Sequence, residues 1–237
     1  MIESHIFDHA WFSIMYQDLE KEYRLRFESR TGYRDRVWKV LTRNFLQAYV
    51  PKEGAVLDLG CGWGEFVNNI EARIKYGMDL NPESARKLSP DVTFLCQDCS
   101  QRWGLPDSTL DIVFSSNFFE HLPSKESLRD TMLEARRCLK PAGRLICVGP
   151  NIRYLRGAYW DFWDHHLPLT DRSLSELLEV VGFRILTRRA RFLPYSMSQG
   201  FAPPVAFLAA YLRLGFLWPL FGKQFLIVAE KPRAMIS

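Results

Sequence analysis

Short apolar runs and segments with helical spacing alternate along the chain from residue 55 onward. The apolar runs predict strands at residues 55–60, 74–79, 92–97, 110–115, 144–148, 183–191 and 224–229. Helical spacing predicts helices at residues 65–71, 82–88, 127–139 and 171–181. Strands that alternate with helices form mainly parallel sheets with helices on both faces. The pattern therefore predicts an α/β fold with a Rossmann-like, doubly wound, seven-stranded and mainly parallel sheet.

Residues 1–50 precede this pattern and differ from it, because they are charged, aromatic and helical in spacing. One apolar face predicts a helix that ends before Pro51. The members of this face are Val37, Trp38, Leu41, Phe45, Leu46 and Tyr49. We therefore expect an N-terminal helical addition at 1–50, followed by one α/β domain at 51–237.

The α/β domain has an apolar insert at residues 194–222, before the last strand. Residues 201–221 carry a single charged side chain, Arg213, as a membrane-spanning helix would. Three prolines nevertheless restrict the helical part to residues 205–218, which is shorter than the roughly 20 residues that a span needs. We therefore expect a lid over the ligand site or a dimer contact. An interfacial helix that contacts lipid is the alternative.

The richest local signal is V-L-D-L-G-C-G-W-G-E-F at residues 56–66, where a strand runs into three glycines. Glycines let a ligand approach the backbone, and a following helix offers free N–H groups. Ligands of such folds bind beyond the carboxyl ends of the strands. Glu65 stands where a nicotinamide-binding G-x-G-x-x-G loop has its third glycine. Asp58 and Glu65 also disfavour a pyrophosphate at this loop.

Two further acids end the next strands. Asp79 lies 19 residues after Gly60 and can accept hydrogen bonds from both hydroxyls of a ribose. Asp98 ends the third strand, in C-Q-D-C-S. An acid at a strand end often only caps a turn, so each acid alone is a weak signal. Their order along successive strands is the stronger observation.

The run acid-x-G-x-G-x-G resembles motif I of the class I S-adenosylmethionine (SAM) methyltransferases of the type 11 kind. The resemblance covers about residues 55–150 and implies an antiparallel last strand. It implies SAM as cofactor and S-adenosylhomocysteine (SAH) as product. Asp79 would hold the ribose, Asp98 and the backbone of Cys99 the adenine, and Asn117 and Phe118 would face the methionine part. The full implied cofactor set is Asp58, Gly60, Cys61, Gly62, Gly64, Asp79, Leu80, Asp98, Cys99, Asn117 and Phe118.

Methyl transfer mainly requires alignment of the nucleophile, the methyl group and the sulfur, because the sulfonium is already activated. A hydroxyl nucleophile also needs a general base. His165 and His166, which follow Asp164, are the first candidates, because histidine titrates near neutral pH and an adjacent acid can hold its tautomer. His121 is a weaker candidate. In the aromatic connection at 151–170, the expected acceptor-binding residues are Asn151, Tyr154, Trp160 and Trp163.

The composition limits which binding partners and which cellular compartment we expect. A net charge of +4 is too small to imply nucleic acid without a clustered basic patch. Arg184, Arg188, Arg189 and Arg191 do cluster, but they fall in a predicted strand, where a solvated face explains them. Five cysteines without a secretory signal predict reduced thiols and a cytoplasmic protein, with contact at the inner membrane surface as the alternative. Cys96 and Cys99 form a C-x-x-C without a second ligand pair, so no metal is expected. We expect a monomer or a homodimer.

The second half, including Y-W-D-F-W-D-H-H-L-P-L-T-D-R-S-L, is loosely similar to bacterial methyltransferases that accompany glycosyltransferases. This similarity implies O-methylation of a sugar or a lipid-carried glycan. A small metabolite, such as a natural product, is the competing acceptor. A SAM- or SAH-binding partner subunit without activity is the non-enzymatic alternative.

Overall fold

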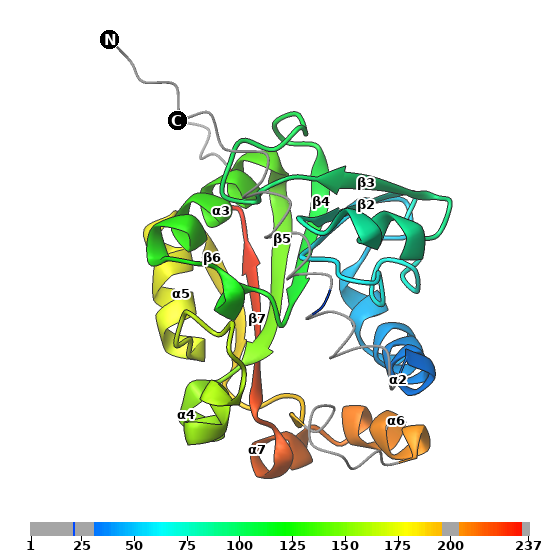
Figure 1. Ribbon diagram of the computed structural model, residues 1–237, viewed down its shortest axis with the longest axis vertical. Helices are drawn as coiled ribbons and strands as arrows, with labels where there is room; N and C mark the ends of the chain where they lie inside the picture. Colours follow the sequence, from blue (N-terminus) through cyan, green and yellow to red (C-terminus); the bar gives the residue numbers. More distant parts are fainter. Residues whose placement is uncertain (1–20, 22–30, 196–203, 234–237) are drawn as a thin grey trace.

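The computed structural model describes residues 21, 31–195 and 204–233, and it confirms the expected α/β fold. A single seven-stranded sheet has the order β3-β2-β1-β4-β5-β7-β6 (Figure 1). Strands β1 to β5 are mutually parallel, and β7 is antiparallel to both of its neighbours. The strands are β1 Ala55–Leu59, β2 Ile74–Asp79, β3 Val92–Cys96, β4 Leu110–Ser116, β5 Leu139–Pro150, β6 Arg184–Arg189 and β7 Gln224–Glu230.

The two faces of the sheet are covered by different segments. Helices α3 (Lys125–Cys138) and α5 (Asp171–Val180) pack on one face, where Met132 and Leu178 are fully buried. Helix α2 (Thr31–Asn44) packs on the other, through Trp38 and Leu41. Neighbouring β4 residues belong to opposite cores, because side chains alternate along a strand.

Two expected helices are shorter or less regular than the sequence predicts. Residues 65–71 form consecutive turns instead of a helix. The side chain of Asn69 donates to the carbonyl of Glu65, and that of Asn68 donates to the carbonyl of Lys87. Such side-chain bonds compete with helical backbone bonds. Residues 82–88 contain a 3₁₀ helix, Pro82–Lys87, capped by the side chain of Asn81.

The additions lie together at the end of the sheet where β7 begins (Figure 1). The N-terminal addition contains α2 and a 3₁₀ turn, Leu46–Tyr49. The insert contains α6 (Val205–Arg213), a turn at Gly215–Leu217 and α7 (Trp218–Phe221). The remainder of both additions, residues 1–20, 22–30 and 196–203, lies outside the described residues. Over the described ranges, no helix has the length and apolar character needed to cross a membrane.

Aromatic side chains fasten the insert to the rest of the protein. Phe192, which follows β6, lies 4.8 Å from Phe45 and 5.0 Å from Trp218 of α7, centroid to centroid. The indole N–H of Trp218 donates to the carbonyl of Tyr211 in α6 at 3.0 Å. The Tyr211 hydroxyl donates in turn to the carbonyl of Phe192. The insert is therefore anchored to both α2 and the sheet.

The connection at 151–170 contains α4 (Ile152–Leu155) and a 3₁₀ segment, Arg156–Asp161. It is folded back on itself by the buried Tyr159, whose hydroxyl donates to the carbonyl of Leu167. Burial raises the pKa of this hydroxyl, and the nearby charge of Glu120 raises it further. Tyr159 is therefore a neutral hydrogen-bond donor that holds the loop.

Candidate active site

The glycine loop after β1 is held against β2. The amides of Gly60 and Cys61 both donate to the carbonyl of Met78, at 2.9 and 3.0 Å. Gly60 has a φ of +70°, and a Cβ added there would lie 2.2 Å from the Phe118 ring. A side chain at this position is thus excluded by both backbone conformation and space.

Asp79 ties the end of β2 to the same loop. Its Oδ2 accepts from the amide of Gly62 at 2.8 Å, and its Oδ1 accepts from the amide of Asn81 at 2.9 Å. The residue is buried. Two backbone donors therefore fix the direction of the carboxylate at the carboxyl edge of the sheet.

Asp58 lies buried under the loop, where its Oδ2 accepts from the amide of Val67 at 3.2 Å. Burial raises the pKa of this carboxyl well above its ordinary value, and the charges of Glu65 and Asp79 raise it further. Glu65 pairs with Arg34 of α2 at 2.6 Å. An added cation near Asp58 would relieve the repulsion among these acids.

The adenine-side candidates follow β3. Asp98 is exposed, and its Oδ1 accepts from both the amide and the hydroxyl of Ser100 at 2.8 Å. Cys99 is buried with its thiol 3.3 Å from the Thr131 hydroxyl, and burial raises the pKa of the thiol to about 12. Cys96 is exposed, and its thiol donates to the carbonyl of Leu80 at 3.6 Å.

Asn117 is held in an unusual conformation directly after β4. Its φ is +50°, which asparagine adopts more readily than most residues. Its amide N–H donates to the carbonyl of Val148, and its Nδ2 donates to the Ser116 hydroxyl at 3.1 Å. Its Oδ1 is buried without a hydrogen-bond partner among the described residues. The structure thus presents an acceptor oxygen beside the glycine loop.

The structure pairs Asp164 with a different histidine from the expected ones. Asp164 Oδ2 lies 2.9 Å from Nδ1 of His121, in the turn Phe119–His121 after β4. His165 is buried among aromatic rings, stacked on Phe162 at 4.9 Å. His166 is exposed, and its amide donates to the carbonyl of Glu120. His121, the histidine ranked lower from sequence, is therefore the one that Asp164 orients.

Glu120, His121 and His165 form a group whose ligand atoms all lie within 4.8 Å of one another. Glu120 is buried, with its Oε1 3.8 Å from Nε2 of His121. These residue types could hold a divalent cation such as zinc. The sequence spacing did not indicate this group, because His165 comes from a connection far along the chain.

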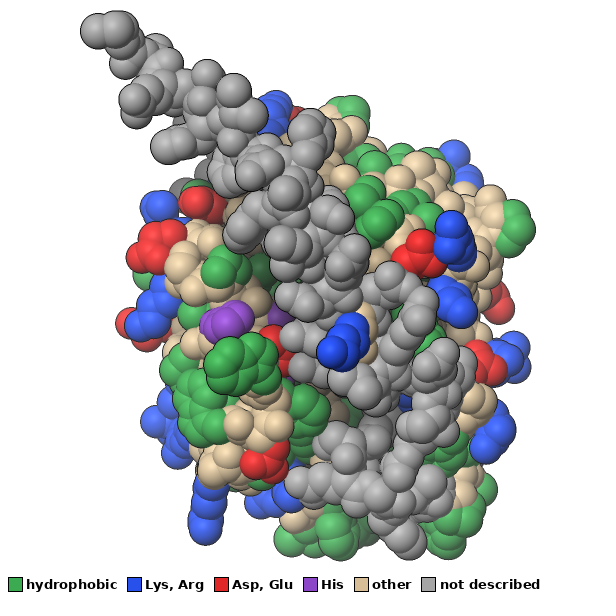
Figure 2. All heavy atoms as spheres, viewed as in Figure 1, with side chains coloured by type: hydrophobic (Ala, Val, Ile, Leu, Met, Phe, Trp, Pro, Cys, Tyr) green, Lys and Arg blue, Asp and Glu red, His purple; other side chains and the backbone are tan. Residues whose placement is uncertain are grey.

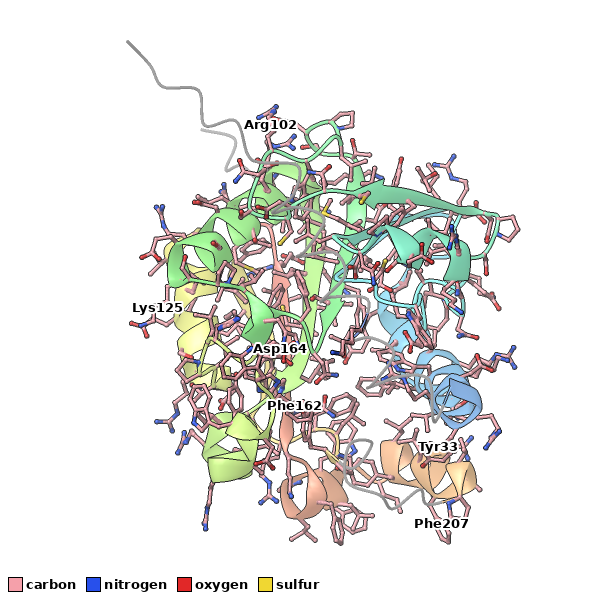
Figure 3. All side chains as sticks on the ribbon, in the orientation of Figure 1. Tyr33, Arg102, Lys125, Phe162, Asp164 and Phe207 are labelled. Atoms are coloured by element: carbon pink, nitrogen blue, oxygen red, sulfur yellow. The ribbon has the colours of Figure 1, made fainter. Side chains whose placement is uncertain are left out.

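A cavity of ≈ 660 Å³ lies between α2, the end of β4 and the insert. Its lining includes Val37 and Trp38 of α2, Asn117 after β4, and Leu208 and Tyr211 of α6. None of the described side chains that line it is charged. Figure 3 shows Tyr33, another lining residue, in the space between α2 and α6. Sequence analysis missed these residues as a ligand site, although it identified the apolar faces from which they come.

The expected acceptor-binding residues lie elsewhere, since this cavity involves none of the four. Asn151 is fully buried and caps α4, with its Nδ2 donating to Asp171 and to the carbonyl of Ala190. Both N–H groups of the Asn151 side chain are therefore used within the protein. The Tyr154 ring lies 5.0 Å from the guanidinium of Arg191. Trp160 and Trp163 are 52% and 92% exposed.

Comparison with known proteins identifies the central part of the chain. A family described as a methyltransferase domain matches residues 57–147, which run from the glycine loop through β5. Residues 57–147 carry a methyltransferase domain. This finding confirms the family expected from the strand ends, whereas the link to glycan biosynthesis receives no support.

Relatives of this methyltransferase domain match it over part of their length. An uncharacterized protein of Methanocaldococcus jannaschii is 30% identical over 65% of both chains. The 2-methyl-6-phytyl-1,4-hydroquinone methyltransferase of a Synechocystis strain is 28% identical over 48% of this chain and 38% of its own length. The chain therefore spans less than two thirds of either relative.

A solved structure shares the fold of the methyltransferase domain. It is a SAM-dependent methyltransferase from Archaeoglobus fulgidus, with a TM-score of 0.60 and 23% identity. The similarity covers 81% of this chain and 92% of that protein. The sheet order and the antiparallel β7 are thus those of the methyltransferase fold.

SAH affinity of the methyltransferase should depend on pH through Asp58. Burial raises the pKa of the free carboxyl, whereas the cationic amino group of SAH favours its ionised form. The pKa of Asp58 is thus lower in the complex, so binding releases a proton and affinity rises with pH between the two pKa values. Calorimetry in buffers of different ionisation enthalpy measures this release. Asp58→Asn should abolish it and the exposed control Asp130→Asn should retain it, whereas SAH binding without proton release would contradict this role.

Proposed function

We propose that the protein transfers the methyl group of SAM to a small, largely apolar acceptor. The observation that carries the proposal is the uncharged cavity next to Asn117, at the carboxyl edge of β4. The glycine loop lies at the same edge, because Phe118 contacts the position of Gly60. Cofactor and acceptor would therefore meet at the end of β4.

The residues present suit the charge and shape of SAM. Asp58 is a buried acid whose raised pKa a cationic amino acid would lower. Asp79 presents a carboxylate fixed by two backbone donors, as a ribose-binding acid requires. Gly60, Gly62 and Gly64 all adopt positive φ and keep the backbone open. We assign the ends of β1, β2 and β3 to the aminoacyl, ribose and adenine parts respectively.

SAM, when bound, supplies a methyl group on an activated sulfonium. The protein must then align the acceptor, exclude water and remove the acceptor's proton. Asn117 Oδ1 is placed to accept a hydrogen bond near the transfer position. We assign proton removal to His121, because Asp164 lies 2.9 Å from its Nδ1 and so fixes the orientation of the imidazole ring.

The lining of the cavity supports an apolar acceptor. A sugar or a glycan carried on a phosphate would require several polar or cationic partners, whereas the described lining is aliphatic and aromatic with few polar groups. An apolar metabolite with few polar groups satisfies this lining. The name of the Synechocystis relative specifies a hydroquinone with a phytyl chain, which is an acceptor of this kind. The partner-subunit alternative leaves the His121–Asp164 pair without a role.

Methyl transfer to an alkylated hydroquinone, followed with SAM labelled in its methyl group, tests this function. Val37→Trp places a large ring in the cavity wall and should raise the acceptor KM at least about tenfold, the loss of about 1.4 kcal/mol of binding. SAH affinity should be unchanged. The control Val180→Trp adds the same ring at a position that is 72% exposed and outside the cavity. Preference for a free sugar over the hydroquinone would overturn the acceptor assignment.

A further inference from the structure

The outer surface of the insert exposes hydrophobic side chains to an unusual degree. Five of the ten large hydrophobic side chains that are exposed in the described part of the chain lie within it: Phe207, Leu214, Phe216, Leu220 and Phe221. Figure 2 shows hydrophobic atoms at the lower end of the molecule, where Figure 1 places α7. Such concentrated exposure marks an interaction surface. We call these five residues the apolar patch.

The apolar patch is continuous with the cavity. Phe207, Leu214 and Phe221 are 65%, 41% and 59% exposed, and they also belong to the cavity lining. Phe216 and Leu220 are 70% and 63% exposed and do not line it. Figure 3 shows Phe207 on the side of α6 that faces away from α2. An apolar molecule could thus pass from the patch into the cavity without crossing a polar surface.

Positive charge accompanies the apolar patch. The insert at residues 194–222 contains no Asp or Glu, and its own cation Arg213 is joined by Arg191 and Lys223 just outside its two ends. Arg213 is exposed at the end of α6. Arg191 donates to the carbonyls of Leu220 and Gly222, which places its guanidinium beside α7. An apolar surface with adjacent cations matches a bilayer that contains anionic lipids.

A second copy of the chain fits this surface poorly. A two-fold dimer brings the same patch of both copies together. Arg191 and Arg213 beside one patch would then face the same residues of the other copy, with no acid from the insert to neutralise them. Such a dimer would also close the cavity through Phe207 and Phe221, whereas a bilayer can supply an apolar molecule to it.

We propose that the apolar patch binds to the surface of an anionic lipid bilayer and receives the acceptor from it. Phe216 and Leu220 enter the headgroup region, and the cavity opens toward the acyl chains. The loading of acceptor rests on the proposed function, whereas the lipid binding itself does not. The proposal requires no membrane-spanning helix.

Vesicle flotation tests the binding directly, without SAM or acceptor. The full chain should float with vesicles of phosphatidylcholine and phosphatidylglycerol, and less with phosphatidylcholine alone or at high salt. The double variant Phe216→Ser with Leu220→Ser should reduce the bound fraction at least about tenfold, because it removes two apolar side chains from the interface. The matched control, Leu133→Ser with Val180→Ser, changes two exposed hydrophobic residues elsewhere and should float like the wild type.

Two outcomes would overturn the proposal. Wild-type protein that stays in solution with anionic vesicles is one, and a double variant that floats as well as the wild type is the other. If the wild type does not float, sedimentation equilibrium measures its oligomeric state. A wild-type protein that is a dimer and a double variant that is a monomer would assign the patch to contact with a second copy of the chain. SAH calorimetry on the same samples separates the lipid-binding proposal from the proposed methyl transfer. If the protein binds SAH but does not float with the vesicles, only the lipid-binding proposal is overturned.

Discussion

Asp79→Ala is expected to weaken SAH binding about 100-fold or more, because it removes the acid assigned to the ribose. Each charge-assisted hydrogen bond contributes about 1.5–3 kcal/mol, and a carboxylate can accept one from each ribose hydroxyl. The substitution also removes the carboxylate that accepts hydrogen bonds from the amides of Gly62 and Asn81. Isothermal calorimetry with SAH measures the affinity directly.

Two further variants test whether the loss of affinity comes from the Asp79 carboxylate itself. Asp79→Asn retains one acceptor oxygen and should lie between wild type and Asp79→Ala. Asp98→Ala removes an exposed carboxylate, so its effect should be smaller. Circular dichroism during thermal unfolding controls for loss of fold. An Asp79→Ala protein that is folded and binds SAH like the wild type would remove the ribose assignment.

His121→Ala is expected to lower turnover about 10²- to 10⁴-fold, the usual contribution of a general base. SAH affinity should remain close to that of the wild type, because His121 lies outside the residues assigned to the cofactor. Steady-state kinetics with the hydroquinone acceptor measures turnover, and calorimetry measures SAH affinity.

The neighbouring histidines provide the comparison for His121. His166 is exposed and contributes only its backbone amide to the loop, so His166→Ala should keep wild-type turnover. Dialysis against a chelator should also leave turnover unchanged, because His121 acts here as a base and not as a metal ligand. Activity that disappears with the chelator and returns with zinc would instead assign Glu120, His121 and His165 to a metal site.

The sequence predictions agree best with the structure where a short sequence pattern is compatible with only one local conformation. The apolar run before Gly60 forms β1, and Asp79 ends β2 as its spacing indicated. The turn at 65–71 is the counterexample, since adjacent asparagines bond the backbone and replace a helix that periodicity alone favours. Periodicity describes which side chains face the core, but it does not describe competing side-chain bonds.

The catalytic and acceptor assignments depended on contacts between distant segments. Asp164 adjoins His165 in sequence, yet its carboxylate meets His121 from the end of β4. Asn151 looked like a loop residue and is instead a buried cap. Adjacent residues in an irregular loop point in different directions, so sequence proximity there carries little information about side-chain contact.

By itself, the sequence determined the parallel α/β sheet, the glycine loop and the acids that end successive strands. These features follow from local rules, because hydrophobic spacing, glycine conformation and strand ends are properties of short segments. Only the tertiary structure brought together the walls of the cavity that we propose for the acceptor. The cavity wall joins α2 to α6, which lie about 170 residues apart in the chain. Each of these segments alone is merely an apolar helix, and the site exists only because Phe45, Phe192 and Trp218 pack the two against the end of the sheet.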